Sequence, residues 1–418
     1  MMYLPFAKAN DISIVAQPYG GFIYSRELNT YTVINNTGYL VLKQLHRFNN
    51  DINKLVDHLS KLYNLSSKQI YNDVKSFLQE LKNFFYIENY NIPIKNNIAI
   101  KKTKIQFEYE KEKDILKMVK ASVDLTYRCN LKCKYCYAKA NEVSFEEIPL
   151  SKWIDILNHS YNRGLRALEI TGGEPFLYKE IFEFIDFISE KFIFEINTNG
   201  HFINKEVARF LANKKPKAIQ ISLDAPKPEI HDKYRGKGSW EKALKAIKIL
   251  REEGIHTRIS MTVYKDNEKF IEDMYKLSQE LDCELIIQSA KPVGRAEVMP
   301  NSFFVKDPQD RRNAFYEFDP NFEIYCQTQL GYASISSNGT IKPCNMEPNF
   351  FVRIGLYHPK NYGKIKNWYT HWFEENIVGY FFKKINKASK SFDRKKIDKN
   401  KMIYPSCILE AYIKFLEK

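Results

Sequence analysis

The run Cys129-Asn130-Leu131-Lys132-Cys133-Lys134-Tyr135-Cys136 constrains this chain more than any other feature of its sequence. Its C-x3-C-x2-C spacing brings three thiolates into one short loop, where they can occupy three corners of a cubane iron–sulfur cluster. The fourth iron of such a cluster has no protein ligand and is open to a further molecule. The sequence therefore predicts a 4Fe–4S cluster on Cys129, Cys133 and Cys136.

A structural zinc site is the alternative for this loop. Zinc sites usually combine paired C-x2-C units into a closed set of four ligands, and no His or Cys follows nearby to complete one. We therefore favour the cluster. The chain has seven cysteines, three of them in this loop, which indicates reduced thiols rather than a disulfide scaffold.

Length and composition bound the remaining possibilities. At 418 residues, 44% of them hydrophobic, the chain is long enough for two or three domains with sizeable cores. It has no apolar run that could span a bilayer, and residues 1–8 lack the features of a signal peptide. We therefore expect a cytoplasmic protein with no membrane partner. The net charge of +14 forms no single basic stripe, so we expect no nucleic-acid partner.

Residues 121 to about 292 alternate short apolar strands with amphipathic helices. Such a repeat predicts an α/β fold with a parallel sheet, either open or curled into a partial barrel. Strands are expected at Ser122–Tyr127, Ala167–Thr171, Ile193–Thr198, Ala218–Leu223, Thr257–Tyr264 and Glu284–Ser289. Helices are expected at Leu150–Arg163, Lys179–Lys191, Asn204–Lys215, Trp240–Glu253 and Glu268–Asp282.

Candidate ligand-binding residues follow these strands. The cysteine loop follows the first strand, Gly172-Gly173-Glu174 the second and Asn199 the third. Ser222 and Asp224 end the fourth strand, and Arg295 follows the sixth. Two glycines let the backbone approach a ligand closely, and a glutamate offers a carboxylate to an ammonium group. Ligands in such folds bind at the carboxyl ends of the strands, so these residues predict one shared site.

With Tyr135 directly before its last cysteine, the loop resembles the signature of the radical S-adenosylmethionine (SAM) enzymes. The resemblance extends from Val123 to about Ala296 and implies a partial (β/α)6 TIM barrel with a 4Fe–4S cluster and SAM as cofactors. The cofactor-binding residues that it implies are Tyr135, Gly172, Gly173, Glu174, Asn199, Ser222, Asp224 and Arg295. In this family, reduction of SAM yields a 5′-deoxyadenosyl radical that abstracts a hydrogen from the substrate. An electron donor such as a flavodoxin or ferredoxin is therefore an expected partner.

The N-terminal part has a different pattern. Gly20–Glu27 and Thr30–Asn35 predict a β-hairpin, three amphipathic helices follow, and Tyr86–Tyr90 is a further candidate strand. This winged-helix-like arrangement resembles the peptide-recognition domain typified by the PQQ-biosynthesis chaperone. The resemblance implies a precursor peptide as partner, whose leader adds a strand to the hairpin. DNA binding is a rival, although the third helix carries no Arg for base readout, and a purely structural lid is another.

The C-terminal part contains a second cysteine pattern. Cys326, a candidate strand at Tyr332–Ser336, the turn Asn338-Gly339 and Cys344 resemble the start of the SPASM and twitch extensions of radical SAM enzymes. Those extensions bind auxiliary iron–sulfur clusters. Only Cys407 remains downstream, so one auxiliary cluster on Cys326, Cys344 and Cys407 is expected rather than two. The alternative is that Cys407 is a small buried side chain and the site is degenerate.

The expected domains are a peptide-binding domain at residues 1–92, a linker at 93–120, a radical SAM core at 121–315 and a small α+β twitch-like domain at 316–418. In this order they resemble maturases of ribosomally synthesised peptides, in particular sactipeptide maturases of the sporulation-killing-factor type. The implied function is radical formation of thioether bonds between cysteine sulfur and an α-carbon of a precursor peptide.

Other functions stay open on the sequence alone. Carbon–carbon cross-linking and epimerisation of a peptide are close rivals, but epimerisation often needs a thiol donor, and the unassigned Cys283 is expected to be structural. Maturation of a sulfatase or a cofactor does not explain the N-terminal domain. An iron–sulfur sensor that binds DNA does not explain Glu174 and its two glycines.

Overall fold

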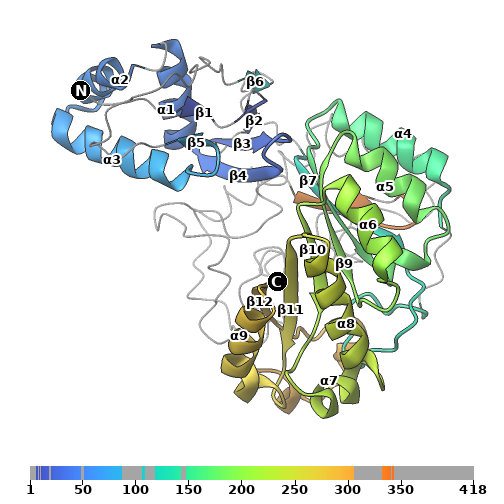
Figure 1. Ribbon diagram of the computed structural model, residues 1–418. Coiled ribbons are helices and arrows are strands. Elements are labelled where there is room, and N and C mark those ends of the chain that lie inside the picture. Colours follow the sequence, from blue (N-terminus) through green and yellow to red (C-terminus); the bar gives the residue numbers. More distant parts are fainter. Residues whose placement is uncertain are drawn as a thin grey trace, which may run out of the picture. The chain divides into compact units, whose positions relative to one another are not determined.

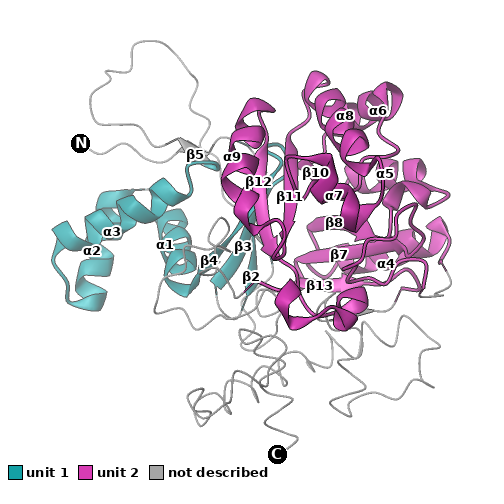
Figure 2. Ribbon diagram, turned by 90° about the horizontal axis from the view of Figure 1, so that it is seen from below, with its two compact units in different colours: residues 1–115 teal, residues 116–418 magenta. Residues whose placement is uncertain are grey.

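The computed structural model describes residues 6–7, 9, 11–17, 20–48, 51–86, 106–108, 118–142, 147–305, 332–339 and 341–342. The chain divides into two compact units, residues 1–115 and residues 116–418, which are coloured separately in Figure 2. Each unit has its own main sheet, and they are described one at a time. None of the helices in these described ranges is long and apolar enough to cross a membrane.

The first unit is built on a four-stranded sheet in the order β4-β3-β2-β6. Its strands are β2 (Ser13–Gln17), β3 (Gly20–Ser25), β4 (Thr30–Asn35) and β6 (Gln106–Glu108). The antiparallel β3–β4 hairpin agrees with the sequence prediction, and its turn residue Asn29 has a φ of 48°, which asparagine tolerates better than most residues. A separate two-stranded sheet pairs β1 (Phe6–Ala7) with β5 (Phe85–Tyr86).

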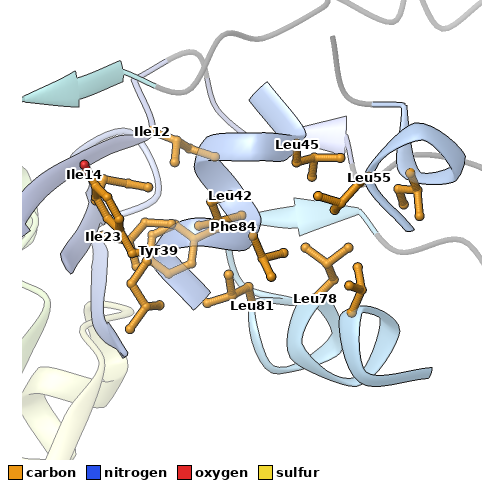
Figure 3. Close-up of a cluster of buried hydrophobic side chains, with 14 of the residues drawn as sticks. Ile12, Ile14, Ile23, Tyr39, Leu42, Leu45, Leu55, Leu78, Leu81 and Phe84 are labelled. Atoms are coloured by element: carbon orange, nitrogen blue, oxygen red, sulfur yellow. The ribbon is translucent and has the colours of Figure 1, made fainter. Parts of the chain in front are cut away.

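Three helices follow the hairpin, as the sequence predicts. They are α1 (Asn36–Arg47), α2 (Ile52–Tyr63) and α3 (Ser67–Glu80). The α3 helix begins after Ser66, whose Oγ accepts the backbone N–H of Gln69 at 3.2 Å. Apolar residues of all three helices pack with the sheet in one core, where Leu42, Leu78 and Ile23 lie in the same cluster (Figure 3). Burying each such aliphatic side chain contributes about 1.5–3 kcal/mol.

Parts of this unit depart from the sequence expectation. Strand β2 was not predicted because all five of its residues are buried, so it lacks the alternation of a half-exposed strand. Strand β6 lies within residues 93–120, which were expected to be a linker, and it pairs parallel with β2. Strand β5 begins at Phe85 rather than at Tyr86.

The second unit contains an eight-stranded sheet in the order β12-β11-β10-β9-β8-β7-β13-β14 (Figure 1). Strands β7 to β12 are parallel and neighbour one another in sequence order, which confirms the expected α/β fold with a partial barrel of six units. These strands are β7 (Lys120–Thr126), β8 (Ala167–Gly172), β9 (Ile193–Thr198), β10 (Ala218–Ser222), β11 (Thr257–Val263) and β12 (Glu284–Ser289). The helices are α4 (Leu150–Tyr161), α5 (Ile181–Ser189), α6 (Lys205–Lys214), α7 (Pro228–Arg235), α8 (Ser239–Glu252) and α9 (Ile271–Glu280).

A hairpin from the C-terminal part extends this sheet beyond β7. Strand β13 (Tyr332–Ile335) pairs parallel with β7, and β14 (Ile341–Lys342) pairs antiparallel with β13. The sequence predicts the hairpin, but assigns it to a separate small domain rather than to the core sheet. The three cysteines of the expected auxiliary cluster, Cys326, Cys344 and Cys407, lie outside the described residues.

Near the amino ends of the strands, one face of the sheet carries a buried ion network. The carboxylate of Glu195 lies 3.2 Å from Arg258 and 3.3 Å from Lys217. Burial alone opposes ionisation, but Lys120 and these two cations together lower the pKa of Glu195 to about 2. Residues two apart on a strand share a face, so Asn197 lies on the same face, toward the carboxyl end. The ion network fills one end of this face, and the other end holds the site described next.

Candidate active site

A cavity of ≈ 230 Å³ lies at the carboxyl ends of the parallel strands. All three cysteines of the C-x3-C-x2-C loop line it. Five of the other residues singled out from the sequence also line it, namely Tyr135, Gly172, Gly173, Asn199 and Ser222. A concave site of this kind, with convergent polar groups, is the usual form of a cofactor or substrate pocket.

The three cysteines of the loop are half-buried. Burial raises the pKa of Cys129 to about 12, and it raises the pKa of Cys133 as well. Two N–H groups are directed at the Cys129 sulfur, the backbone N–H of Leu131 at 3.4 Å and the side-chain Nδ2 of Asn199 at 3.9 Å. Such hydrogen bonds and a bound cation both favour the thiolate over the thiol. The surroundings of Cys129 therefore fit a sulfur ligand to iron.

Two side chains outside the cysteine loop, one just after it and one from a distant segment, fix its path. Asn141 accepts the N–H of Cys129 at 2.8 Å and donates to the Cys129 carbonyl at 2.7 Å. Arg295 donates from Nε to the Cys133 carbonyl and from Nη1 to the Ala140 carbonyl, both at 2.8 Å. Arg295 was expected to bind the cofactor, but it does not line the cavity and instead holds the backbone that carries the thiols.

Two glycines allow the neighbouring backbones to approach this loop. A Cβ on Gly173 would lie 2.2 Å from the carbonyl oxygen of Arg128. A Cβ on Gly294 would lie 2.3 Å from the carbonyl oxygen of Cys136, and Gly294 also has a φ of 61°. Both separations are far below any real carbon–oxygen contact, so the loop can pack here only against glycine.

Glu174 lies beside the cavity rather than in its lining. Its buried carboxylate accepts the Thr198 hydroxyl at 2.7 Å and the backbone N–H of Asn199 at 2.9 Å. Burial raises the pKa of Glu174 to about 7, although these hydrogen bonds act in the opposite direction. In this structure the carboxylate ties the turn after β8 to the end of β9.

Asp224 is also fully buried and does not line the cavity. It forms a bidentate pair with Arg235, with N–O distances of 2.7 and 3.0 Å, and it accepts the hydroxyl of Tyr135. Arg235 lines the cavity and lies close enough to Cys133 to oppose the rise in the pKa of that thiol. At the cavity surface, where Asp224 was expected, the structure instead places its partner Arg235, which Asp224 holds in position.

Several lining residues were not predicted from the sequence. Arg235, Tyr137 and Gln220 line the cavity, and so do Glu169 and Gln288. Gln220 shares the face of Ser222 because it lies two residues earlier on β10, so strand alternation could have identified it. No sequence signal distinguishes Arg235 from the other cations of its segment.

Cys283 stands apart from the site. It is absent from the cavity lining, and its Sγ lies 3.3 Å from the carbonyl oxygen of Leu281. Burial raises its pKa to about 11, so the thiol is protonated at neutral pH. These properties agree with the structural role expected for it.

Comparison with protein families identifies two regions. Residues 123–278 match the Radical SAM superfamily, and residues 20–83 match the coenzyme PQQ synthesis protein D (PqqD) family. The first match covers the cysteine loop and most of the parallel sheet. The second covers the β3–β4 hairpin and the three helices of the first unit.

Two curated proteins are similar over part of the chain. The antilisterial bacteriocin subtilosin biosynthesis protein AlbA of Bacillus subtilis is 29% identical over 259 residues, which are 57% of this chain and 57% of AlbA. The Fe-coproporphyrin III synthase of Methanosarcina barkeri is 33% identical over 160 residues, 38% of this chain and 40% of that protein. The similar region thus spans about half the length of these relatives.

Among solved structures, Streptococcus suis SuiB bound to the precursor peptide SuiA has a TM-score of 0.59. The match covers 99% of this chain and 97% of SuiB at 18% sequence identity. At this identity the similarity shows the fold alone. It extends through both units of the chain.

Proposed function

We propose that this chain, which carries a PqqD domain and a radical SAM domain, is an enzyme that modifies a ribosomally synthesised precursor peptide by radical chemistry. One observation carries the proposal. The three thiols of the C-x3-C-x2-C loop line a single cavity at the carboxyl ends of the strands, in a chain that also carries a peptide-recognition fold. The name of AlbA and the SuiB structure with its precursor peptide support the same assignment.

In this proposal, Cys129, Cys133 and Cys136 hold a 4Fe–4S cluster, and SAM occupies the adjacent cavity. When bound, the cluster and SAM supply radical hydrogen abstraction from an unactivated carbon. The residues that line the cavity orient the cofactor and exclude water. A cluster of this kind is sensitive to oxygen, so we also propose a reducing, cytoplasmic location.

The cofactor-binding residues fall into two groups. Tyr135, Gly172, Gly173, Asn199 and Ser222, together with Arg235, line the cavity and are proposed to contact SAM. The second group is proposed to act through its neighbours. Glu174 holds the turn after β9, Asp224 holds Arg235, and Arg295 holds the cysteine loop. The second group supports the geometry of the first.

The first unit is proposed to bind the leader of the precursor peptide. Strand β4 is an end strand of its sheet within the described residues, and most of its side chains are only half buried. Such an edge presents unpaired backbone groups to which an extended peptide can add as a further strand. This use of the edge accounts for the PqqD domain without invoking DNA.

Formation of a thioether between cysteine sulfur and an α-carbon is the reaction proposed first, with an auxiliary cluster on Cys326, Cys344 and Cys407. Carbon–carbon cross-linking and epimerisation are the rival peptide reactions. A second class of function is the maturation of a cofactor. We consider it because the chain is similar to the Fe-coproporphyrin III synthase. Neither cofactor maturation nor DNA sensing would use both the first unit and the cavity in one function.

Mass spectrometry of the product tests the proposal. The anaerobic protein is incubated with SAM, dithionite and a precursor peptide encoded by a short open reading frame beside the gene. A loss of two hydrogens for each bond formed indicates a cross-link, and trapping of free thiols distinguishes a thioether from a carbon–carbon bond. An unchanged mass with altered chirality would instead indicate epimerisation. An unmodified peptide, under conditions in which SAM is cleaved, would contradict peptide modification.

The auxiliary cluster has a separate test. After anaerobic reconstitution, one 4Fe–4S cluster gives about four irons per chain, and a second cluster raises the count to about seven or eight. A count that stays near four refutes the auxiliary site and leaves the cluster on Cys129, Cys133 and Cys136 unaffected.

A further inference from the structure

Between residues 131 and 135, side chains of the cysteine loop alternate between the cavity and the protein surface. Leu131, Cys133 and Tyr135 line the cavity. Lys132 and Lys134, which lie between them in the sequence, are exposed and are absent from the cavity lining. The outer face of the loop that carries the thiols is therefore cationic.

The end of α7 extends this cationic face. The backbone N–H of Lys134 donates to the carbonyl of Tyr234 at 2.9 Å, and the Nζ of Lys134 lies 5.3 Å from the centre of the Tyr234 ring. A Cβ on Gly236 would lie 3.6 Å from the side chain of Leu131, so the residues after α7 pack against the loop. Lys237 follows Gly236 directly and is exposed. We call Lys132, Lys134 and Lys237 the lysine face.

This face carries a local excess of positive charge. Residues 128–139 and 233–237 contain seven Lys and Arg and no Asp or Glu. Four of the seven have a carboxylate partner, since Arg128 pairs with Glu147, Lys139 with Glu297, Lys233 with Asp266 and Arg235 with Asp224. Within the described part of the chain, the three members of the lysine face have no ion-pair partner. The excess is thus concentrated on the outside of the cysteine loop.

We propose that the lysine face is the docking surface for an acidic one-electron carrier protein of the flavodoxin or ferredoxin class. The proposal rests on the function proposed above, because only a reductively started reaction needs such a carrier. In the transfer, the reduced carrier loses one electron and the cluster gains it, without bond formation or proton transfer. Complementary charge would steer the carrier to this face and accelerate association.

The position of the lysine face favours an electron carrier over other acidic partners. Lys132 and Lys134 are the chain neighbours of Cys133, so a carrier seated on them lies against the segment that holds a proposed cluster ligand. Electron transfer slows steeply with distance, so a carrier gains from docking on the segment that holds the thiols. An acidic precursor peptide, by contrast, has to reach the cavity on the other side of these residues.

A charge-reversal experiment tests the docking surface. The variants are K132E/K134E, and K237E, which leaves the cysteine loop unchanged. The matched control is K248E/K276E, whose lysines are exposed on the later parts of α8 and α9, away from the carboxyl ends of the strands. The probe is a purified flavodoxin, and its binding to the reconstituted protein is measured by biolayer interferometry at low and at high salt.

For the unmodified protein and the control, flavodoxin should bind at low salt and dissociate at high salt. K132E/K134E should associate about tenfold more slowly, and K237E should show a smaller loss in the same direction. Equal association by all variants, or no salt-dependent binding of flavodoxin, would overturn the docking surface. Weaker binding of the precursor peptide with unchanged binding of flavodoxin would overturn it in favour of a peptide site.

A second readout separates this proposal from the proposed function. The rate of cluster reduction is followed by absorbance, with either reduced flavodoxin or dithionite as donor. Only the flavodoxin rate should fall in K132E/K134E, since dithionite is a small molecule that needs no docking surface. An equal loss with both donors would mean that the lysines support the cluster itself, and would overturn the docking role. No SAM cleavage with dithionite in any variant would contradict the proposed function instead.

Discussion

The Nδ2 of Asn199, which follows β9, lies 3.9 Å from the Sγ of Cys129 in the loop after β7. Asn199 is anchored on its other side, because its backbone N–H donates to Glu174 at 2.9 Å and its Oδ1 accepts the N–H of His201. The Nδ2 of Asn199 also donates to the Oδ1 of Asn130 at 2.7 Å. A buried carboxylate in the turn after β8 therefore helps to position an amide that faces Cys129, although Glu174 itself does not line the cavity.

Removal of this amide should change the cluster potential. N–H groups directed at a ligating sulfur stabilise the more negative, reduced state of a cluster. Asn199→Ala should therefore lower the midpoint potential by about 40 mV, which corresponds to roughly 1 kcal/mol for one electron. The measurement is a redox titration followed by electron paramagnetic resonance. The control Asn204→Ala removes the N-terminal cap of α6 and should leave the midpoint potential unchanged. If the potential of Asn199→Ala also stayed the same, Asn199 would not tune the cluster.

Gly173 should be required for cluster binding. In Gly173→Ala the new methyl group would lie 2.2 Å from the Arg128 carbonyl, so the backbone next to Cys129 has to move. We expect most of the bound iron to be lost after anaerobic reconstitution, as measured by iron and sulfide analysis. Gly254→Ala is the control, because a Cβ added there would have no atom within 4 Å, even though the φ of Gly254 is 74°. The Gly254→Ala protein should lose about 1–2 kcal/mol of stability but retain its iron. Equal iron contents in the two variants would contradict the close-packing argument.

His231 should make the protein sensitive to mild acid. Its Nδ1 accepts the backbone N–H of Asp224 at 3.1 Å, and burial lowers the pKa of this histidine to about 4. Between pH 6.5 and 4 the unfolded chain therefore binds a proton that the folded protein does not, so stability falls as the pH falls through this range. Between pH 7.5 and pH 5 this histidine should contribute a loss of about 2 kcal/mol.

The variant His231→Asn isolates this contribution. Asparagine keeps a hydrogen-bond acceptor in place of Nδ1 but does not titrate. The free energy of unfolding of both proteins is measured by urea denaturation at pH 7.5 and pH 5, and the variant should lose less stability than the parent. An equal loss in the two proteins would show that His231 is not the group that titrates.

Peptide binding should protect the β4 edge. When the leader of the precursor peptide is added, the backbone amides of Thr30–Asn35 should exchange more slowly with deuterium, because an added strand supplies new hydrogen-bond partners. The helix α2 (Ile52–Tyr63) serves as the internal control and should not change. Protection of α2 without protection of β4 would contradict the proposed docking mode.

The sequence predicted the repeat and the cysteine loop well, because both depend on local patterns. Alternation of short apolar strands and amphipathic helices indicated the succession of β7 to β12. The helix α7 was not predicted, since its eight residues are too few for a clear helical period. Strand β13 was recognised as part of a hairpin, but its pairing with β7 is a long-range contact that no local pattern encodes.

For the site, residue type indicated the location of a side chain more reliably than it indicated its contacts. Gly173 lies where the spacing predicted, since close packing against Arg128 tolerates only glycine. Asp224 and Arg295 were expected to contact the cofactor, but their hydrogen bonds go to Arg235 and to the Cys133 carbonyl. Which of two paired side chains faces a cavity depends on packing in three dimensions. The sequence alone therefore could not distinguish Arg235 from the other cations of its segment.

The most direct test of the account is 5′-deoxyadenosine formation by the anaerobically reconstituted protein with SAM and dithionite. The protein should form 5′-deoxyadenosine, Cys133→Ala should lose this activity together with the cluster absorbance, and the control Cys283→Ala should retain both. Undiminished 5′-deoxyadenosine formation by Cys133→Ala, or zinc instead of iron in the parent protein, would contradict the account.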